Sequence, residues 1–199
     1  MDSKKFRCIK PEIRILGIDD GQFIPRTKGI VDVVGVVYRG GFWFEGVMHT
    51  QITIDGLDAT EKLAEMIKTS PYYPELRVVI LDGVTFAGFN VVDISALCQM
   101  VTLPVISVVR NKPDLEDIKN ALTNLPDSEL RWRAMQNAGQ LFDVKTRDGD
   151  NPIFVHLSGI LFDDAQKILK KTSTRSNIPE ALRVAHIIAS GLTKTIEKI

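Results

Sequence analysis

The chain has few of the features that mark several large classes of protein. It contains only two cysteines, Cys8 and Cys98, without metal-ligand spacing, so neither a disulfide framework nor a cysteine-bound metal is indicated. No apolar run is long enough to span a bilayer, and residues 1–7 are polar and basic, without the hydrophobic core of a signal peptide. We therefore expect a soluble, cytoplasmic protein without a membrane partner, in which Cys98 is a small core residue.

Charge of one sign is also lacking. The formal net charge is +0, so no global field steers the protein toward nucleic acid, and any basic surface must be local. Hydrophobic residues make up 44% of the chain, an ordinary globular proportion, and 199 residues suffice for one α/β domain with a full core. With no internal repeat or low-complexity linker, we predict a single domain over 1–199. The oligomeric state stays open.

What the chain does have is an aspartate at the end of each of two apolar strands. The first strand runs through Ile13–Ile18 into Asp19 and Asp20, and the second runs through Val78–Leu81 into Asp82. A carboxylate in such a place is costly unless it is hydrogen-bonded, paired or bound to a cation. If the two strands are neighbours, their ends would bring together hard oxygen ligands, the type that Mg²⁺ and Mn²⁺ select.

The first part of the chain predicts an antiparallel meander. Strands are expected at 13–19, 31–39 and 42–54, and their short connections make them antiparallel neighbours. Gly40-Gly41 supplies the hairpin-type turn between the second and third strands. A helix with one apolar face follows at 59–69.

The remaining segments predict parallel βα units and then a helical second half. Strands at 78–81 and 104–109 are separated by a helix at 91–102, which implies parallel, right-handed crossovers. A hairpin within 142–157 would extend the sheet or cap one face. Further helices are expected at 114–124, 127–137, 163–171 and 179–198. The fold class is therefore α/β, a mixed sheet flanked by helices.

A meander followed by βα units, with acids ending the first and fourth strands, resembles the ribonuclease H-like fold. Leu16–Asp19 resembles the opening of endonuclease V. Asp82-Gly83, followed by a helix and Leu103–Arg110, resembles the "DG…PTIGVAK" block of that family.

Three further stretches resemble a more specific family. They are GIDDG at 17–21, DGLDAT at 55–60 and SNIPE at 176–180. All three are similar to an uncharacterised archaeal family named domain of unknown function ninety-nine, which is itself related to endonuclease V. The resemblance covers nearly the whole chain and is most specific over 14–20 and 77–110.

The resemblance implies a set of site residues. Asp19 matches the first catalytic aspartate and Asp82 the second, Asp58 falls near the catalytic glutamate, and Arg110 stands where the active-site lysine would be. It implies that Asp19, Asp82 and Asp58 hold Mg²⁺ or Mn²⁺, and that the partner is DNA or RNA.

The chain also departs from the endonuclease V pattern. The loop after Asp82 lacks that family's histidines, and Ser176 or Asn177 stands where a histidine is expected near the last helix. Pro71–Pro74 echoes the strand-separating wedge but follows the helix, so we interpret it as a helix-to-strand connection. These departures do not support recognition of deaminated bases.

Each acidic residue has a structural alternative. Asp20-Gly21 and Asp82-Gly83 are also turn sequences, and which of Asp19 and Asp20 faces the site stays open. Asp58 with Glu61 forms a capping-box pattern, and a carboxylate with several lone pairs can serve both as a cap and as a ligand.

Nucleic-acid contacts are expected from Gly83, Thr85, Arg110, Lys112 and Asn177. Basic residues that directly follow a strand either form a solvated edge of the protein or bind the phosphates of a nucleic-acid backbone. The same two interpretations apply to the basic residues of 167–183. Asn177 also reads as an N-cap before Pro179 and Glu180, the interpretation that we favour, although a helix N-terminus can hold a phosphate.

Two other sets of residues are weaker candidates. In the loop after Asp82, Phe86 and Phe89 either stack on a base or belong to the core, and this loop offers few polar groups for reading a base. His49, His156 and His186 share no metal-ligand spacing, and His186 lies in an apolar helix, so it is interpreted as a core histidine.

The leading hypothesis is a divalent-metal-dependent nuclease that hydrolyses phosphodiesters. One or two Mg²⁺ ions, about 3.5–4 Å apart in a two-metal site, would activate a water and stabilise the departing oxygen, while Arg110 offsets charge on the phosphate. The alternative is a nucleic-acid-binding module that keeps the fold but has lost hydrolysis. A weaker resemblance of 17–21 to the phosphate loop of actin-like ATPases is disfavoured, because those proteins need two related lobes.

Overall fold

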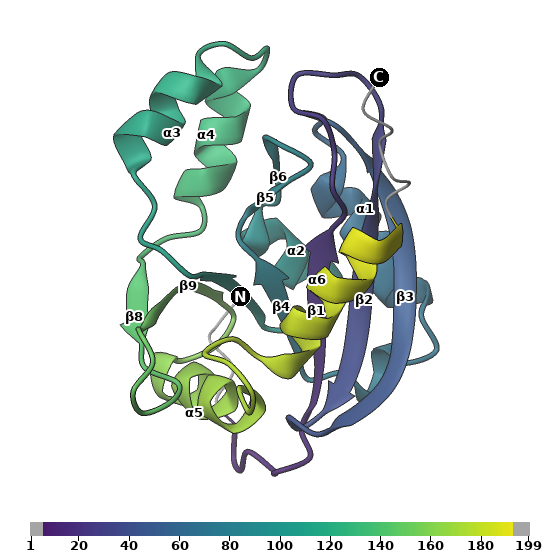
Figure 1. Ribbon diagram of the computed structural model, residues 1–199, viewed down its shortest axis with the longest axis vertical. Helices are drawn as coiled ribbons and strands as arrows, with labels where there is room; N and C mark the ends of the chain where they lie inside the picture. The colour runs from purple at the N-terminus through teal and green to yellow at the C-terminus, as the bar shows by residue number, and fades with distance from the viewer. Residues whose placement is uncertain (1–5, 193–199) are drawn as a thin grey trace.

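The computed structural model describes residues 6–192, in which a seven-stranded sheet carries helices on both faces (Figure 1). The strand order is β3-β2-β1-β4-β7-β9-β8. The strands of this sheet are β1 (Arg14–Asp20), β2 (Ile30–Arg39), β3 (Trp43–Thr53), β4 (Val78–Asp82), β7 (Val105–Val109), β8 (Phe142–Val144) and β9 (Ile153–Ser158). The helices are α1 (Ala59–Thr69), α2 (Ile94–Val101), α3 (Leu115–Leu122), α4 (Ser128–Gln136), α5 (Phe162–Thr172) and α6 (Glu180–Leu192).

The pairing of the strands confirms the mixed sheet. Strand β2 is antiparallel to both β1 and β3, whereas β1, β4 and β7 are parallel neighbours. Strand β9 pairs antiparallel with β7 and with β8, so the hairpin expected within 142–157 extends the sheet. The carboxyl ends of β1, β4 and β7 therefore lie at one edge, the place where α/β proteins bind ligands.

Side chains that alternate along the strands divide the core between the two faces. On one face, Leu16 and Ile18 of β1 pack in the cluster formed with α1 and α2. On the other, Ile15 of β1 and Ile80 of β4 pack in the cluster formed with α5 and α6. Figure 1 shows α6 crossing the sheet over β1 and β2, with α1 and α2 behind it.

Gly17 lets α6 lie directly on β1. A Cβ atom at this position would overlap the backbone of Ala181 and Leu182 in the first turn of α6. Any larger residue would push the helix off the strand, so Gly17 sets the distance between the first strand and the last described helix.

The helix expected at 91–102 is shorter than the sequence predicted. A two-stranded hairpin, β5 (Thr85–Phe86) and β6 (Asn90–Val91), takes up its start. The side chain of Asp93 then accepts hydrogen bonds from the backbone N–H groups of Ser95 and Ala96, which caps α2. An N-cap aspartate is a strong local start signal, and it overrides the apolar run that precedes it.

Both capping predictions for the candidate site residues are wrong. Asp58 precedes α1, but its carboxylate makes no cap hydrogen bond and is held by Thr53 and Asn90 instead. Asn177 donates to the backbone oxygen of Asn151, and α6 begins only at Glu180. The last part of the helix expected at 179–198 lies outside the described residues.

The remaining expectations about packing are met. Pro71–Pro74 belongs to the connection between α1 and β4, which contains a short 3-10 helix, η1 (Tyr73–Glu75). Phe86 and Cys98 are buried in the core cluster around α2, so Phe86 does not stack on a base. Within residues 6–192, the structure contains no helix with the length and apolar character needed to cross a membrane.

Candidate functional site

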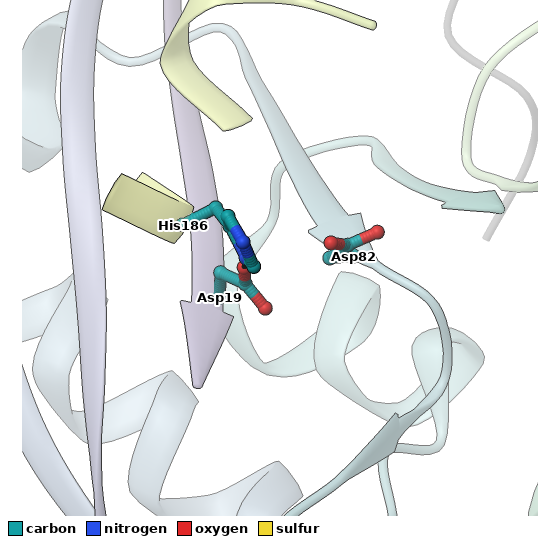
Figure 2. A group of neighbouring side chains, drawn as sticks. All are labelled: Asp19, Asp82 and His186. Carbon is teal, nitrogen blue, oxygen red and sulfur yellow. Dashed lines mark hydrogen bonds and ion pairs between the residues drawn. The ribbon is translucent and has the colours of Figure 1, made fainter. Parts of the chain in front are cut away.

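An acidic cluster lies where the carboxyl ends of β1 and β4 meet. Asp19, Asp82 and His186 each offer one ligand atom, and these three atoms lie within 4.8 Å of one another (Figure 2). Among the described residues, no other group of three such side chains meets the same condition. The convergence of Asp19 and Asp82 agrees with the expectation from the sequence, whereas His186 was not expected there.

The strand register explains why the two aspartates meet. Ile18 of β1 is the parallel partner of Leu81 of β4, so the next residues, Asp19 and Asp82, end adjacent strands. Asp19 lies an even number of residues after Ile15 on β1, and Asp82 lies an even number after Ile80 on β4. Because side chains alternate between the faces of a sheet, both aspartates lie on the α6 face, with Ile15 and Ile80.

His186 corrects the interpretation drawn from the sequence. Its Nδ1 lies 2.7 Å from Oδ2 of Asp19, and 55% of its side chain is exposed, so it is not a core histidine. The buried positions of α6 include Ala181, Leu182, Ala185 and Ala189, which leaves position 186 beside the buried face. The helical spacing of these buried positions was the one sign in the sequence that residue 186 lies outside the core. Ile187 obscured this sign, because it is apolar and yet exposed.

Burial and the repulsion between carboxylates dominate the electrostatics of the cluster. Burial, together with repulsion from Asp82 and Asp20, raises the pKa of Asp19 to about 7, against the hydrogen bond from His186. Burial also raises the pKa of Asp82, while the charge of Arg110 lowers it. The expectation that gathered carboxylates would raise at least one pKa is therefore confirmed.

Arg110 is the cationic side chain that forms an ion pair with Asp82 of this cluster. Its Nη1 lies 3.7 Å from Oδ2 of Asp82, and 48% of the Arg110 side chain is exposed. It directly follows β7, the next parallel strand, so its position at the rim comes from the same strand alternation that places Asp82. An exposed guanidinium at this rim can reach both the carboxylate and an approaching phosphate.

Asp20 takes a different role from Asp19. Its side chain points to the other face, where Oδ2 accepts a hydrogen bond of 2.6 Å from the backbone N–H of Ala87. This bond ties the end of β1 to the β5–β6 hairpin. The open choice between the two aspartates is thus settled in geometry: Asp19 lies in the cluster, and Asp20 holds the neighbouring loop.

Asp58 does not join the cluster, although the sequence made it a candidate ligand. Its Oδ1 accepts hydrogen bonds from the side chain of Asn90 and the backbone N–H of Thr53, and its Oδ2 accepts from the Thr53 hydroxyl. Burial alone would raise its pKa, but these hydrogen bonds lower it. The arrangement stabilises the ionised carboxylate as a brace between β3 and β6.

The expected nucleic-acid contacts divide into two regions. Gly83 and Thr85 line a pocket next to the end of β4, and Lys112 lines an adjoining hollow. Asn177 instead precedes the first turn of α6 and is held by Asn151, whereas His186 lies further along the helix. The structure therefore gathers Gly83, Thr85, Arg110 and Lys112 around one edge, and Asn177 stands apart.

The cluster fits a divalent cation by the chemistry of its donors. Two carboxylates and an imidazole are suitable ligands for Mn²⁺, and the carboxylates also suit Mg²⁺. A cation would offset the repulsion that raises the pKa of Asp19, because a nearby positive charge favours the ionised acid.

The comparisons with known proteins agree with this architecture. The UPF0215 protein of Methanopyrus kandleri is 49% identical over 190 residues, which are 96% of this chain and 96% of the relative. A crystal structure of a protein of unknown function from Archaeoglobus fulgidus aligns with a TM-score of 0.80 and 38% identity, over 90% of this chain and 97% of the other.

Endonuclease V has the same fold at much lower identity. The Bacillus subtilis protein aligns with a TM-score of 0.63 and 16% identity, over 91% of this chain and 81% of its own. The Ciona intestinalis protein, solved with a 24mer DNA containing an inosine followed by a ribo-adenosine, aligns with a TM-score of 0.56 and 15% identity, over 87% and 82%. The fold is therefore ribonuclease H-like, as in endonuclease V.

The family model described as Endonuclease dU matches residues 11–193. Domain of unknown function ninety-nine is an older name for this family, so the resemblance found in the sequence is confirmed. The chain belongs to the Endonuclease dU family.

Proposed function

We propose that this protein is a divalent-metal-dependent endonuclease that cleaves a phosphodiester of DNA near a deoxyuridine. The observation that carries the proposal is the meeting of Asp19, Asp82 and His186 at the shared end of β1 and β4. The family description, Endonuclease dU, supplies the nucleotide, and the fold is shared with endonuclease V, which in Ciona intestinalis was solved with DNA.

Asp19, Asp82 and His186 would hold the cation. When bound, it supplies Lewis-acid stabilisation of the charge that develops on the phosphodiester during in-line displacement. Mg²⁺ and Mn²⁺ both suit a carboxylate-rich site, and the imidazole favours Mn²⁺ more than Mg²⁺.

The chain's own residues supply orientation and charge. His186, hydrogen-bonded to Asp19, fixes the direction of that carboxylate and stays accessible to solvent. Arg110 would bind a phosphate oxygen beside Asp82 and offset its charge. Asp58 has no part in this proposal, because its oxygens are engaged by Thr53 and Asn90.

The alternative, a binding module that has lost hydrolysis, drew its support from the histidines missing from the loop after Asp82 and from the one missing near 176–177. His186 supplies an imidazole at the cluster, which removes the second of these grounds, whereas the loop after Asp82 still lacks histidine. Binding without cleavage stays a distinct outcome of the test.

The test is cleavage of end-labelled oligonucleotides that carry one deoxyuridine, one inosine or neither, with Mg²⁺, Mn²⁺ or a chelator. We expect metal-dependent cleavage of the deoxyuridine strand by the native protein and none by Asp82→Asn. Absence of cleavage of every strand with either metal would overturn the nuclease proposal, and tight binding under those conditions would favour the binding module.

A further inference from the structure

A second hollow lies on the opposite face of the sheet from the acidic cluster. It has a volume of about 440 Å³, lies beside the carboxyl ends of β4 and β7, and is lined on its other side by α3 and α4. Pockets that bind small organic groups are commonly of this size and mostly apolar, with a few directed polar groups. Its apolar walls include Val84, Val109, Leu115, Ile118, Trp132 and Met135.

Two polar side chains at this pocket have unsatisfied atoms. The Oγ of Ser107 on β7 and the Nδ1 of His156 on β9 are both buried and have no hydrogen-bond partner among the described residues. Ser107 itself is 1% exposed, and the two residues are direct cross-strand partners. A buried polar atom left unpaired is costly, so a pair of them lining one pocket calls for a partner from outside the chain, either a water or a ligand that displaces it.

The pocket also offers a flat aromatic wall. Trp132 of α4 lines it, and Lys119 of α3 lies 5.6 Å from the centre of the Trp132 ring. Aromatic walls of this kind stack on nucleobases, and nearby cations attract phosphates. The wall is firmly placed, because the buried Arg131 beside Trp132 donates to backbone oxygens of Asp55, Gly56 and Phe89.

The pocket and the acidic cluster adjoin at the end of β4, where consecutive residues belong to the two sites. Asp82 belongs to the cluster, and the next residue, Gly83, lines the pocket. Gly83 has φ +80, a left-handed conformation that turns the chain from one face of the sheet toward the other. A strand crossing this edge could therefore present a phosphodiester to the cluster and a base to the pocket.

We propose that this pocket receives a nucleobase swung out of the strand that is cut, and that Ser107 and His156 read its polar edge. The inference rests on the proposed endonuclease function and adds to it the place where the base is recognised. Enzymes that act at a single base commonly extrude it into such a pocket. The loop after Asp82 offers few polar groups for reading a base, and Ser107 of β7 and His156 of β9 would add two more.

The chemistry of the two atoms selects a class of base. Burial lowers the pKa of His156, against hydrogen bonding to the backbone of residues 138–140, so its ring is neutral near pH 7. Unprotonated Nδ1 accepts a hydrogen bond from a ring N–H, and the Ser107 hydroxyl donates to the adjacent carbonyl. Uracil and hypoxanthine carry this carbonyl and N–H pair, as do thymine and guanine, whereas cytosine and adenine carry an amino group beside a ring acceptor.

A fluorescence titration tests occupancy without relying on cleavage. The chain has two tryptophans, so Trp43→Phe leaves Trp132 in the pocket wall as the only one. Single-stranded oligonucleotides that differ only in one deoxyuridine or deoxycytidine would be titrated in the presence of a chelator. We expect a saturable change in Trp132 emission with the deoxyuridine strand and binding several times weaker with the deoxycytidine strand.

Two substitutions test the reading of the base. Ser107→Ala and His156→Phe should each reduce the preference for deoxyuridine by about threefold to tenfold, because each removes one hydrogen bond. His49→Phe is the matched control, since His49 pairs with Asp32 on the exposed surface of β2 and β3. Ile118→Phe, which narrows the pocket from α3, replaces either variant if its melting curve shows unfolding. Manganese binding should be unchanged in all of them.

The outcomes separate the two proposals. Cleavage at deoxyuridine with an unchanged Trp132 signal, or with base preference intact in Ser107→Ala and His156→Phe, would overturn the pocket while the nuclease stands. Equal Trp132 responses to both strands would also overturn it. A deoxyuridine-dependent signal without any cleavage would support the pocket and refute the nuclease.

Discussion

His186 and Asp19 are hydrogen-bonded at 2.7 Å although 167 positions separate them in the chain. The contact joins α6 to the end of β1 and places an exposed imidazole over an almost fully buried carboxylate. The candidate site is therefore built from β1, β4 and α6, three segments that only the fold brings together.

His186→Ala should weaken Mn²⁺ binding by about tenfold or more, because it removes one of three ligand atoms and the partner that orients Asp19. Stability should change by no more than about 0.5 kcal/mol, since the side chain is largely exposed. Calorimetric titration with Mn²⁺ and thermal melting measure the two effects. His49→Ala serves as the control, and equal metal affinity in both variants would remove His186 from the site.

Asp82→Asn should lower metal-dependent cleavage by about a hundredfold or more while the metal-free protein melts at the same or a higher temperature. Substitution removes one of the charges that repel Asp19, so the fold loses an unfavourable interaction. Cleavage rates and melting without metal test this. Asp163→Asn, on the exposed start of α5, should alter neither quantity. A clear fall in melting temperature would instead favour a purely structural turn at Asp82.

The stability of the metal-free protein should fall as pH rises from about 4 to about 7. The pKa of Asp19 is raised from 3.8 to about 7 in the folded protein, so across this window the folded state keeps a proton that the unfolded chain has lost. Stability decreases with pH wherever the folded state binds more protons. Melting curves of the native protein and Asp19→Asn, recorded with a chelator, should converge near pH 4 and separate above pH 7, with the variant more stable.

Asp58→Ala should lower the stability of the fold and leave metal binding intact, whereas Asp82→Asn should impair the metal-dependent reaction and leave the stability unchanged or higher. It leaves Asn90, which is fully buried, and Thr53 without their carboxylate partner, at a cost of about 1–3 kcal/mol. Mn²⁺ affinity should be retained, because the cluster does not include Asp58. Paired denaturation and metal titration would decide, and loss of metal affinity at unchanged stability would restore Asp58 as a ligand.

Nucleic-acid binding should depend strongly on salt, because the net charge is zero and only local cations can contact phosphates. Each contact contributes a slope of about −0.7 to −0.9 in log K against log salt. Lys112→Ala, at the hollow beside the pocket, should remove about one such contact. Lys62→Ala, whose ammonium faces Glu65 on α1, should leave the slope unchanged. Identical slopes in the two variants would place the nucleic acid elsewhere.

Local sequence patterns were sufficient for most of the fold. Helix 59–69 was predicted to about its observed bounds, and the antiparallel meander of β1, β2 and β3 followed from apolar runs and short connections. The pairing of β1 with β4 was expected from the resemblance to the ribonuclease H-like fold. The patterns failed where a single side chain decided the outcome. Asp93 starts α2 later than the apolar run suggests, and Asp58 turns toward Asn90 instead of capping α1.

The candidate site divides in the same way. Asp19 and Asp82 could be found because an acid at the end of an apolar strand is conspicuous in a sequence. His186 was missed, because its spacing from them carries no motif and its helix is apolar, so only the periodicity of the buried positions pointed to it. Ser107 and His156 become partners only through the register of β7 and β9, which no local pattern in either strand specifies.

The close seating of α6 on Gly17 has a consequence for biosynthesis. β1 leaves the ribosome before α6, so a nascent chain that has not yet released residues 180–192 holds the two aspartates without the imidazole. The cluster would then be complete only once α6 has emerged and docked, and fragments cut short before α6 would lack its third member. The order of synthesis itself would therefore delay the assembly of the candidate metal centre.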